Sequence, residues 1–515
     1  MRRLRKIYAA CLSIVLTLPC VGAASSPSVA VPPGPATVRH ISDWVHCDGK
    51  TDDWSGVVQA FAAAKNNAFT LQVDCPVFIH VGTDVARPIF VDNGTYVNFT
   101  AKGEFILDNA LVPSFVITNS SNIVFANWKV NYVGALPLDH HTDGYFNNGD
   151  WVAKPTAPAA VFNDGTRTDW LKANRGITFA SQVRAWWHGP TNSSALFFIE
   201  GDSQNLTFVN MALAVPPNAG GHQFIPMAFS MTPGYKSNVT AIKPTDAAQS
   251  DYATMEPIIA TPSNLTFANI TLDGYYMGFQ GTLQNATFSN ITALRYGDLQ
   301  DADGGTVGGI KKWFAPPHLF YLNGRAASPY DPYNDPFDPI LTIHNITIAH
   351  VRDMGPRIGA SRDVPGQPPS GYADSLKISG TNTSVTDYQS NRPDGLADIL
   401  QCNGMVLRNI TATYNSAFVH GLSPAIRFPA TGYYQNLTLS NVTLTDTAAV
   451  PQSVPITDNK NPHWDLHNEN IQFNNVVVNL KQLPQNASGQ TITNLQPVIA
   501  GENISIPVTL HVWSE

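Results

Sequence analysis

Asn264-Leu-Thr-Phe-Ala-Asn269-Ile-Thr271 returns 21 residues later as Asn285-Ala-Thr-Phe-Ser-Asn290-Ile-Thr292, and the prediction of the architecture starts from this repeat. Both copies follow the pattern Asn–apolar–x–apolar–x–Asn–apolar. Internal similarity at a period of about 20–50 residues is the signature of a repeat architecture. Further copies begin at Asn122, Asn205, Asn436 and Asn470, and degenerate copies end at Asn345 and Asn409.

Each copy has the pattern of a short β-strand, because apolar residues alternate with polar ones and many are β-branched or aromatic. Asn tolerates the left-handed backbone of a corner, and stacked Asn amides can hydrogen-bond from one coil to the next. A single rung cannot bury its apolar face alone, so neighbouring rungs must stack. We therefore predict an all-β protein folded as a single-stranded, right-handed parallel β-helix, a solenoid that forms one domain over residues 25–515.

The composition excludes several classes of protein. The chain has 515 residues, 13% of them charged, and 30 Lys+Arg stand against 38 Asp+Glu for a net charge of −8. An acidic chain without a basic face is unsuited to wrapping nucleic acid. No charge-rich or Ser/Gly-rich stretch marks disorder. We expect neither a nucleic-acid partner nor a coiled coil.

The first 24 residues have the pattern of a secretory signal peptide. Arg2, Arg3, Arg5 and Lys6 precede the apolar run Ile7–Leu18, and small residues follow at 22–24. This run is too short to span a membrane as a helix. We expect a secreted monomer, extracellular or periplasmic, with no membrane insertion.

Cysteines and sequons fit an exported chain. Cys47 and Cys75 are able to pair in an oxidising compartment, which leaves Cys402 as a buried thiol. The sequence contains seventeen Asn-x-Ser/Thr sequons, and most coincide with the repeat. We interpret these Asn residues first as corner residues, with glycosylation as the alternative. No CxxC, HExxH or spaced His cluster supports a metal site, and no motif indicates a cofactor.

The N-terminal part of the mature chain predicts a capping helix. Apolar residues at Trp54, Val57, Val58 and Phe61 form one helical stripe, and residues 51–53 supply N-cap candidates. Such a helix would cover the open end of the solenoid. The run Asp48-Gly-Lys-Thr-Asp-Asp53 before this stripe resembles the N-terminus of pectate-lyase-superfamily β-helices, including the polygalacturonases of glycoside hydrolase family 28.

Two stretches interrupt the repeat, near 138–192 and near 352–400. The first is rich in Trp and the second in Pro and Gly, with several charges. Long connections on a repetitive scaffold often carry function, so we expect these two to form walls of a groove along one sheet.

The resemblance to family 28 implies a catalytic pattern of Asn-Thr-Asp, Asp-Asp, Gly-His-Gly and Arg-Ile-Lys, which this chain does not contain intact. The nearest analogue is Arg295-Tyr-Gly-Asp298-Leu-Gln-Asp301-Ala-Asp303. Val419-His420-Gly421 resembles a fragment of the His motif, and Arg427 follows it. The order of acid cluster, His and Arg is kept, and the spacing is not.

The acid cluster has a physical case of its own. Glycoside hydrolysis needs one carboxylic acid and one carboxylate. Asp298, Asp301 and Asp303 lie so close in sequence that their mutual repulsion should raise at least one pKa, which suits a general acid. The alternatives are a fragment of a Ca²⁺ loop and a solvated turn. We predict that these three residues and His318 are catalytic, and expect substrate contacts from Arg295, Lys311, Trp313, His420 and Arg427.

Three functions remain open at this point. The leading one is a secreted, carbohydrate-active glycoside hydrolase with a polysaccharide or oligosaccharide substrate. The second is a polysaccharide lyase that performs β-elimination on a uronate polymer, with Lys377, His420 and Arg427 as its reactive set. The third is a non-catalytic glycan-binding or structural β-helix, because one fold hosts many activities.

Overall fold

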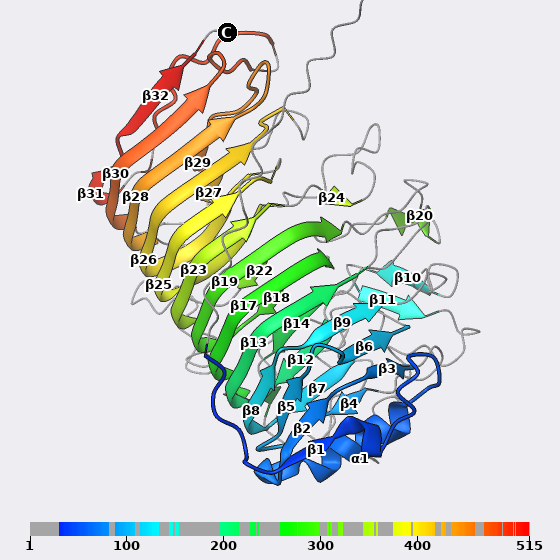
Figure 1. Cartoon of the computed structure of the whole chain (residues 1–515). Helices are drawn as coiled ribbons and strands as arrows, with labels where there is room; N and C mark the ends of the chain where they lie inside the picture. The colour runs from blue at the N-terminus through cyan, green and yellow to red at the C-terminus, as the bar shows by residue number, and fades with distance from the viewer. Residues whose placement is uncertain are drawn as a thin grey trace, which may run out of the picture.

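A computed structural model of the chain shows a solenoid of stacked coils with one helix at its N-terminal end (Figure 1). It describes residues 30–81, 88–108, 114–132, 144–147, 150–153, 195–215, 227–232, 234–235, 258–275, 277–297, 306–307, 310–311, 318–322, 343–354, 357–358, 374–392, 395–417, 424–428, 434–458, 468–486, 488–497, 499 and 501–513.

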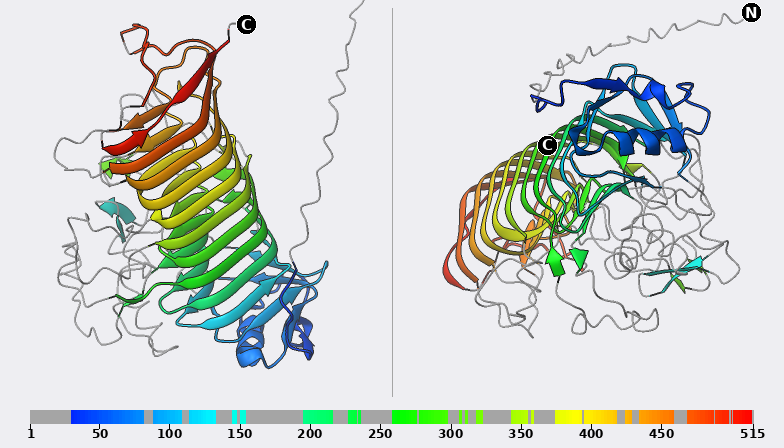
Figure 2. Two further views of the ribbon diagram at one scale, coloured as in Figure 1. Left: turned by 90° about the vertical axis from the view of Figure 1, so that its left-hand side faces the viewer. Right: turned by 90° about the horizontal axis from the view of Figure 1, so that it is seen from below.

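The coils form one continuous sheet of 26 strands whose pairings are all parallel, and it wraps into three faces (Figure 2). Sheet 1 contains β4 (Ile89–Phe90), β7 (Phe115–Thr118), β12 (Ala195–Glu200), β14 (Met227–Thr232), β18 (Phe279–Gly281), β22 (Phe320–Leu322), the first parts of β25 (Leu376–Ser390) and β26 (Ala397–Tyr414), β27 (Ile426–Phe428) and β29 (Ile456–Asp458).

Sheets 2 and 3 complete each coil. Sheet 2 contains β1 (Val38–His40), β2 (Thr70–Val73), β5 (Tyr96–Phe99), β8 (Ser121–Ala126), the first parts of β13 (Gln204–Ala214), β17 (Ser263–Tyr275), β19 (Gln284–Gly297), β23 (His344–Asp353), β28 (Tyr434–Asp446) and β30 (Asn468–Leu480), the middle of β25 and β26, and β31 (Glu502–Ser505). Sheet 3 contains β3 (Pro76–Ile79), β6 (Glu104–Leu107), β9 (Lys129–Tyr132), the last parts of the long strands, and β32 (Val508–Val512).

The remaining elements lie outside these three faces or at the ends. They are β24 (Arg357–Ile358), which pairs with the end of β19, the antiparallel pairs β10 (Gly144–Asn147) with β11 (Asp150–Ala153), β15 (Gly234–Tyr235) with β16 (Ile258–Ala260) and β20 (Thr306–Val307) with β21 (Ile310–Lys311), and the short 3₁₀ turns Ile41–Asp43 and Lys65–Asn67. The parallel β-helix predicted from the repeat is therefore confirmed. No helix in the described ranges is long and apolar enough to cross a membrane.

The repeated Asn residues bend the long strands. Asn205, Asn264 and Asn285 adopt positive φ where sheet 1 turns into sheet 2, and Asn210 and Asn269 do so where sheet 2 turns into sheet 3. Each turn carries a ladder of side-chain amides from coil to coil, exemplified by Asn269 Nδ2 donating to Asn210 Oδ1 at 2.8 Å. The amide ladder expected from the sequence is confirmed. The strands are longer than expected, because a single left-handed residue turns the chain without ending its pairing with the next coil.

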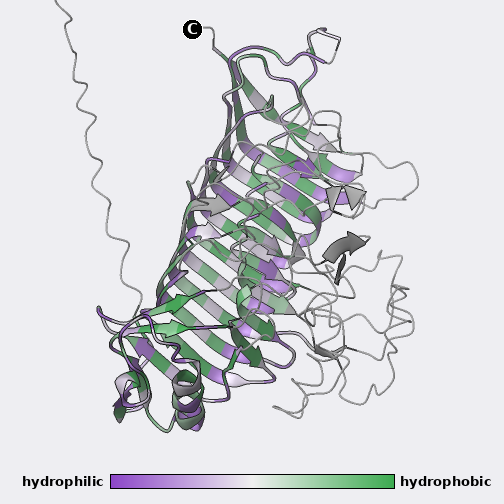
Figure 3. Ribbon diagram, turned by 90° about the vertical axis from the view of Figure 1, so that its right-hand side faces the viewer, coloured by the Kyte–Doolittle hydropathy of each residue, from purple (hydrophilic) through white to green (hydrophobic). Residues whose placement is uncertain are grey.

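Stacked aromatic rings fill the inside of the solenoid. Phe208, Phe267 and Phe288 lie in register on sheet 2, and the last two are 4.8 Å apart and nearly parallel. A second column on sheet 1 includes Phe229 and Phe279, 5.0 Å apart. Apolar and polar residues alternate along the strands (Figure 3), so every second side chain contributes to this core.

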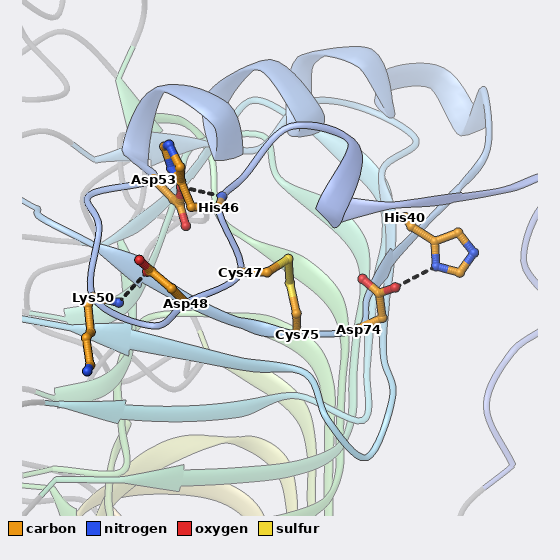
Figure 4. Close-up of a disulfide and its surroundings, with 8 residues drawn as sticks. All are labelled: His40, His46, Cys47, Asp48, Lys50, Asp53, Asp74 and Cys75. Atoms are coloured by element: carbon orange, nitrogen blue, oxygen red, sulfur yellow. Dashed lines mark hydrogen bonds and ion pairs between the residues drawn. A yellow bond between two sulfur atoms is a disulfide. The ribbon is translucent and has the colours of Figure 1, made fainter.

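The predicted capping helix is present as α1 (Trp54–Ala63). Phe61 contacts the rings of Phe105 and Phe115 in the first coils, which closes that end of the core. Asp53 is the N-cap residue, but its carboxylate accepts hydrogen bonds from the His46 backbone N–H at 2.9 Å and from the His46 ring at 2.7 Å instead of capping the helix (Figure 4).

A disulfide joins Cys47 to Cys75 and ties the loop before α1 to the first coil (Figure 4). The pairing that the sequence left open is thus formed, and Cys402 is a free, buried thiol as expected. In the same loop, hydrogen bonds from Thr51 and from the Lys50 backbone lower the pKa of Asp48 to about 2.

The expected insertion near 352–400 is shorter than predicted. Strand β25 and the first residues of β26 lie inside that stretch, and β23 ends at Asp353, at its beginning. Of its charged residues, Lys377, Asp387 and Asp398 lie on strands of the solenoid, whereas Asp374 and Arg392 lie just outside the two ends of β25. Most of the stretch 138–192, and the signal sequence, lie outside the described residues.

Candidate functional site

Three strands of sheet 1 carry a charged residue between two apolar ones. The triplets are Leu376-Lys377-Ile378, Ala397-Asp398-Ile399 and Ile426-Arg427-Phe428. The flanking side chains are buried in the core. Because successive side chains of a strand point to opposite faces, the charged residue of each triplet points outward.

These residues stack in register along the solenoid. Tyr321 on β22 is paired with Lys377 on β25, Lys377 with Asp398 on β26, and Asp398 with Arg427 on β27. Neighbouring strands are ~4.8 Å apart, so the four side chains form a continuous row, which we call the charged column. Gln280 and Ser230 extend the same row toward the N-terminal end.

Arg427 joins two carboxylates. One guanidinium nitrogen, Nη2, donates to Oδ2 of Asp374 and lies 3.1 Å from Oδ2 of Asp398. Asp374 precedes β25 and is completely buried, and Arg427 is 7% exposed. Burial of a charged group costs desolvation free energy unless the group is paired. This cost explains why the Arg427 guanidinium contacts both carboxylates.

Asp398 combines burial with an unpaired oxygen. Only 5% of the residue is exposed although it points outward. Desolvation raises the pKa of Asp398 above its ordinary value, and the Arg427 and Lys377 cations oppose only part of this rise. Its second oxygen, Oδ1, has no hydrogen-bond partner within the described part of the chain. The column therefore holds a carboxyl group that binds a proton more readily than an ordinary Asp.

His318 and Tyr321 lie at the other end of the column. His318 is 1% exposed, and its Nδ1 donates to the backbone carbonyl of Asp374 at 2.7 Å. Its ring lies edge-on to Tyr321, with 5.4 Å between the centroids. The ammonium of Lys377 lies over the Tyr321 ring, 4.9 Å from its centroid. His318 is thus a buried histidine that contacts both Asp374 and Tyr321.

The residues predicted from sequence divide into three groups. The structure brings His318 and Arg427 together with Lys377 around Asp374 and Asp398. It places the backbone of Arg295 on β19, in register with Asp273, and that of Lys311 on β21. Asp298, Asp301, Asp303, Trp313 and His420 lie outside the described residues.

Sequence analysis missed Tyr321, Asp374 and Asp398. The signal that would have found Asp398 is the charged residue in the middle of an apolar triplet, at the same position of three successive coils. No such signal marks Asp374, because it precedes its strand and acts through Arg427, 53 residues later. In the described ranges no group of three His, Cys, Asp or Glu residues is arranged to hold a metal ion.

Comparisons with known proteins find similar structures, while no family model and no curated sequence matches the chain. A polygalacturonase from Erwinia carotovora ssp. carotovora is 11% identical, with 94% of this chain and 96% of that chain covered and a TM-score of 0.35. The surface adhesin PfbA of Streptococcus pneumoniae is 12% identical over 93% and 92% of the two chains, with a TM-score of 0.37.

A third similar structure is the A-module of a mannuronan C-5 epimerase from Azotobacter vinelandii, 9% identical over 92% and 97% of the two chains, with a TM-score of 0.34. The chain is thus structurally similar to polygalacturonases and to other right-handed β-helix proteins. These similarities assign neither an activity nor a residue role to it.

Proposed function

We propose that the chain is an exported glycoside hydrolase that acts on a polysaccharide or oligosaccharide at the outer face of sheet 1, around Asp398. One observation carries this proposal. Asp398 is an outward-pointing, nearly buried carboxyl group between two cations, and its Oδ1 atom has no hydrogen-bond partner in the described part of the chain.

Asp398 is the proposed general acid. Hydrolysis of a glycosidic bond requires a carboxylic acid that protonates the leaving oxygen. Burial raises the pKa of Asp398, so this residue keeps its proton closer to neutral pH than an exposed Asp does. Tyr321 and Lys377, next to it on the same face, are proposed substrate contacts, since an aromatic ring can pack against the apolar face of a sugar.

The second carboxylate is proposed to come from Asp298, Asp301 or Asp303. Asp374 is unsuited to this role because it is completely buried and its carboxylate is bound to Arg427. The segment with the three Asp residues leaves β19 at Gly297 and returns to sheet 1 at His318. Because only β25 separates β22 from β26, this return point is ~10 Å from Asp398 along the solenoid.

The other predicted residues also have proposed roles. His318 holds the backbone of Asp374, and Arg427 holds both carboxylates. Arg295, Lys311, Trp313 and His420 remain proposed substrate contacts. The signal sequence and the disulfide support export as part of the same proposal.

A polysaccharide lyase is the second candidate, and the position of Lys377 favours it. β-Elimination needs a base for the proton next to a uronate carboxylate and cations that neutralise that carboxylate. Lys377 is partly exposed and lies next to Asp398, and Arg427 follows one coil later. His420 would complete this set.

The test is to incubate the purified protein with a panel of neutral and acidic polysaccharides, following reducing ends and the ultraviolet absorbance of unsaturated products together. Reducing ends without absorbance support the hydrolase, and both signals together indicate the lyase. Neither signal over a broad panel would contradict both and favour a non-catalytic, glycan-binding protein.

The residue assignment is tested by Asp398→Asn. Loss of a general acid lowers kcat about 10²–10⁴-fold. Asp202→Asn, at an exposed turn of the coil that contains β12, is the matched control and should keep full activity. Asp301→Asn and Asp303→Asn test the source of the second carboxylate. An unchanged kcat in Asp398→Asn would refute its assignment as the acid.

A further inference from the structure

A second ion pair lies behind the charged column, inside the solenoid. Asp353, at the end of β23, accepts hydrogen bonds at Oδ2 from the Arg392 guanidinium and from the Ser375 hydroxyl. The Ser375 hydroxyl also contacts the Tyr388 hydroxyl at 2.6 Å. All four residues are at most 1% exposed. We call Asp353, Ser375, Tyr388 and Arg392 the buried network.

Charges are concentrated here beyond what the fold requires. Of the eight Asp, Glu, Arg and Lys side chains buried in the described part, five belong either to the buried network or to the column with Asp374. They are Asp353, Asp374, Arg392, Asp398 and Arg427. The other three, Asp53, Glu200 and Asp446, lie at separate places in the fold. A buried ion pair contributes little net stability compared with well-packed apolar residues, so its presence calls for another explanation.

The network and the site meet at one dipeptide. Asp374 binds Arg427 through its carboxylate and His318 through its carbonyl. Ser375, the next residue, is held by Asp353 and Tyr388. Lys377 follows two residues later on β25, the strand that begins directly after Ser375. The backbone at Asp374–Ser375 is therefore held by His318 through the Asp374 carbonyl and by the network through the Ser375 hydroxyl.

We infer that the buried network positions the site: Asp353, with Arg392 and Tyr388, holds the Ser375 hydroxyl, and thereby sets the place of the Asp374 carboxylate and the Lys377 ammonium relative to Asp398. This inference rests on the proposed function for its effect on catalysis. None of the four residues touches the substrate, so they are positioning residues. Displacement of a reacting group by ~1 Å can lower a rate by about 10²-fold.

The first experiment uses Ser375→Ala, with Ser375→Thr as the variant that restores the hydroxyl. Ser375→Ala is expected to lower kcat about 10–100-fold with little change in KM, because the change displaces groups near the acid without removing a substrate contact. Ser375→Thr is expected to recover a large part of this loss. Equal loss of kcat in both variants would contradict the inference.

The second experiment separates positioning from stability. A buried ion pair replaced by apolar residues of similar volume often leaves a protein equally or more stable. In Asp353→Leu/Arg392→Met, the Tm is therefore expected to be kept while kcat falls as in Ser375→Ala. A double variant that keeps both Tm and kcat would overturn the inference.

A third readout does not depend on activity. The titration of Asp398 is followed by NMR on Asp labelled with ¹³C at the carboxyl carbon, with Asp398→Asn to assign its signal. If Ser375→Ala loosens Asp374 from Arg427, the guanidinium is freer to bind Asp398, and the titration midpoint of Asp398 shifts down. An unmoved midpoint together with a lowered Tm would show that the network is only structural, whether or not any polysaccharide is cleaved.

Discussion

At the scale of single residues, outward-pointing polar groups on sheet 1 are set by the two-residue period of the strand. Asp398 and Arg427 reach each other because the register places them on adjacent coils. The same period places Glu200 outward on β12, since Phe197 and Ile199 fill the core. Glu200 is 1% exposed, and its Oε1 has no hydrogen-bond partner within the described ranges.

The buried carboxyl group of Glu200 leads us to predict that the stability of the folded protein depends on pH. Burial raises the pKa of Glu200 to about 8 from 4.5, so the folded state keeps a proton that the unfolded state loses. The native state binds more protons between these values, and stability therefore falls as the pH rises from about 4.5 to 8. The shift corresponds to roughly 4–5 kcal/mol at 1.36 kcal/mol per pKa unit.

Glu200→Gln removes this titration. We expect the variant to be close to the wild type in Tm near pH 4.5 and clearly more stable near pH 9, in thermal unfolding followed by circular dichroism. Asp202→Asn, an exposed neighbour, should show no such pH-dependent difference. A Tm difference between Glu200→Gln and wild type that stays constant with pH would contradict the prediction.

At the scale of elements, each corner Asn has two roles, one for its backbone and one for its side chain. Its backbone adopts the left-handed conformation, and its side chain donates to the coil before it. Asn269 does both, with φ of 55° and its amide 2.8 Å from Asn210. His350 and Asp387 replace Asn at the same corner in two coils, and they face each other as a His–Asp pair at 3.5 Å.

Two substitutions separate the role of the backbone from that of the side-chain amide. Asn269→Gly keeps the left-handed backbone and loses the amide, whereas Asn269→Ala loses both. We expect Asn269→Gly to lower the free energy of unfolding, measured in urea, by about 1 kcal/mol. Asn269→Ala should lower it by about 1–2 kcal/mol more. Asn474→Ala, an exposed residue next to the corner Asn475, is the control. An equal loss of unfolding free energy in Asn269→Gly and Asn269→Ala would show that the left-handed backbone at this position does not affect stability.

At the scale of the whole molecule, a stack of coils has two ends that must be covered. The N-terminal end is covered by α1, and the disulfide links its loop to the first coil. At the C-terminal end, the side-chain amide of Gln496 pairs with both the N–H and the carbonyl of Val508, at 3.0 and 2.8 Å, as a further strand would. Helix α1 at one end and the Gln496 side chain at the other thus each protect a sheet edge that would otherwise be exposed.

Removal of the disulfide should loosen the N-terminal end. Cys47 and Cys75 are 28 residues apart, and a loop of this size contributes about 2–4 kcal/mol. Cys47→Ala/Cys75→Ala is therefore expected to lower the Tm and to speed amide hydrogen exchange in α1 and the first coils before it does so near β30. Cys402→Ala, which removes the free thiol, is the control. Uniform exchange along the solenoid would contradict a cap that acts locally.

Much of this protein follows from its sequence alone. The recurring Asn, the alternation of apolar residues and the helical stripe at 54–61 predict coils, corners and cap, because these depend on local backbone preference and on the burial of one face per rung. Two cysteines near the cap allowed the disulfide, though only the folded chain shows that they meet.

The candidate site was decided by tertiary structure. His318, Arg427 and Lys377 appeared in the sequence as separate residues, and Asp374 and Asp398 did not stand out. They meet because parallel stacking brings together residues that are 20 to 60 positions apart and share a register position. Such proximity has no local signal: the same charged residue between two apolar ones would be an isolated surface charge on a strand without neighbours.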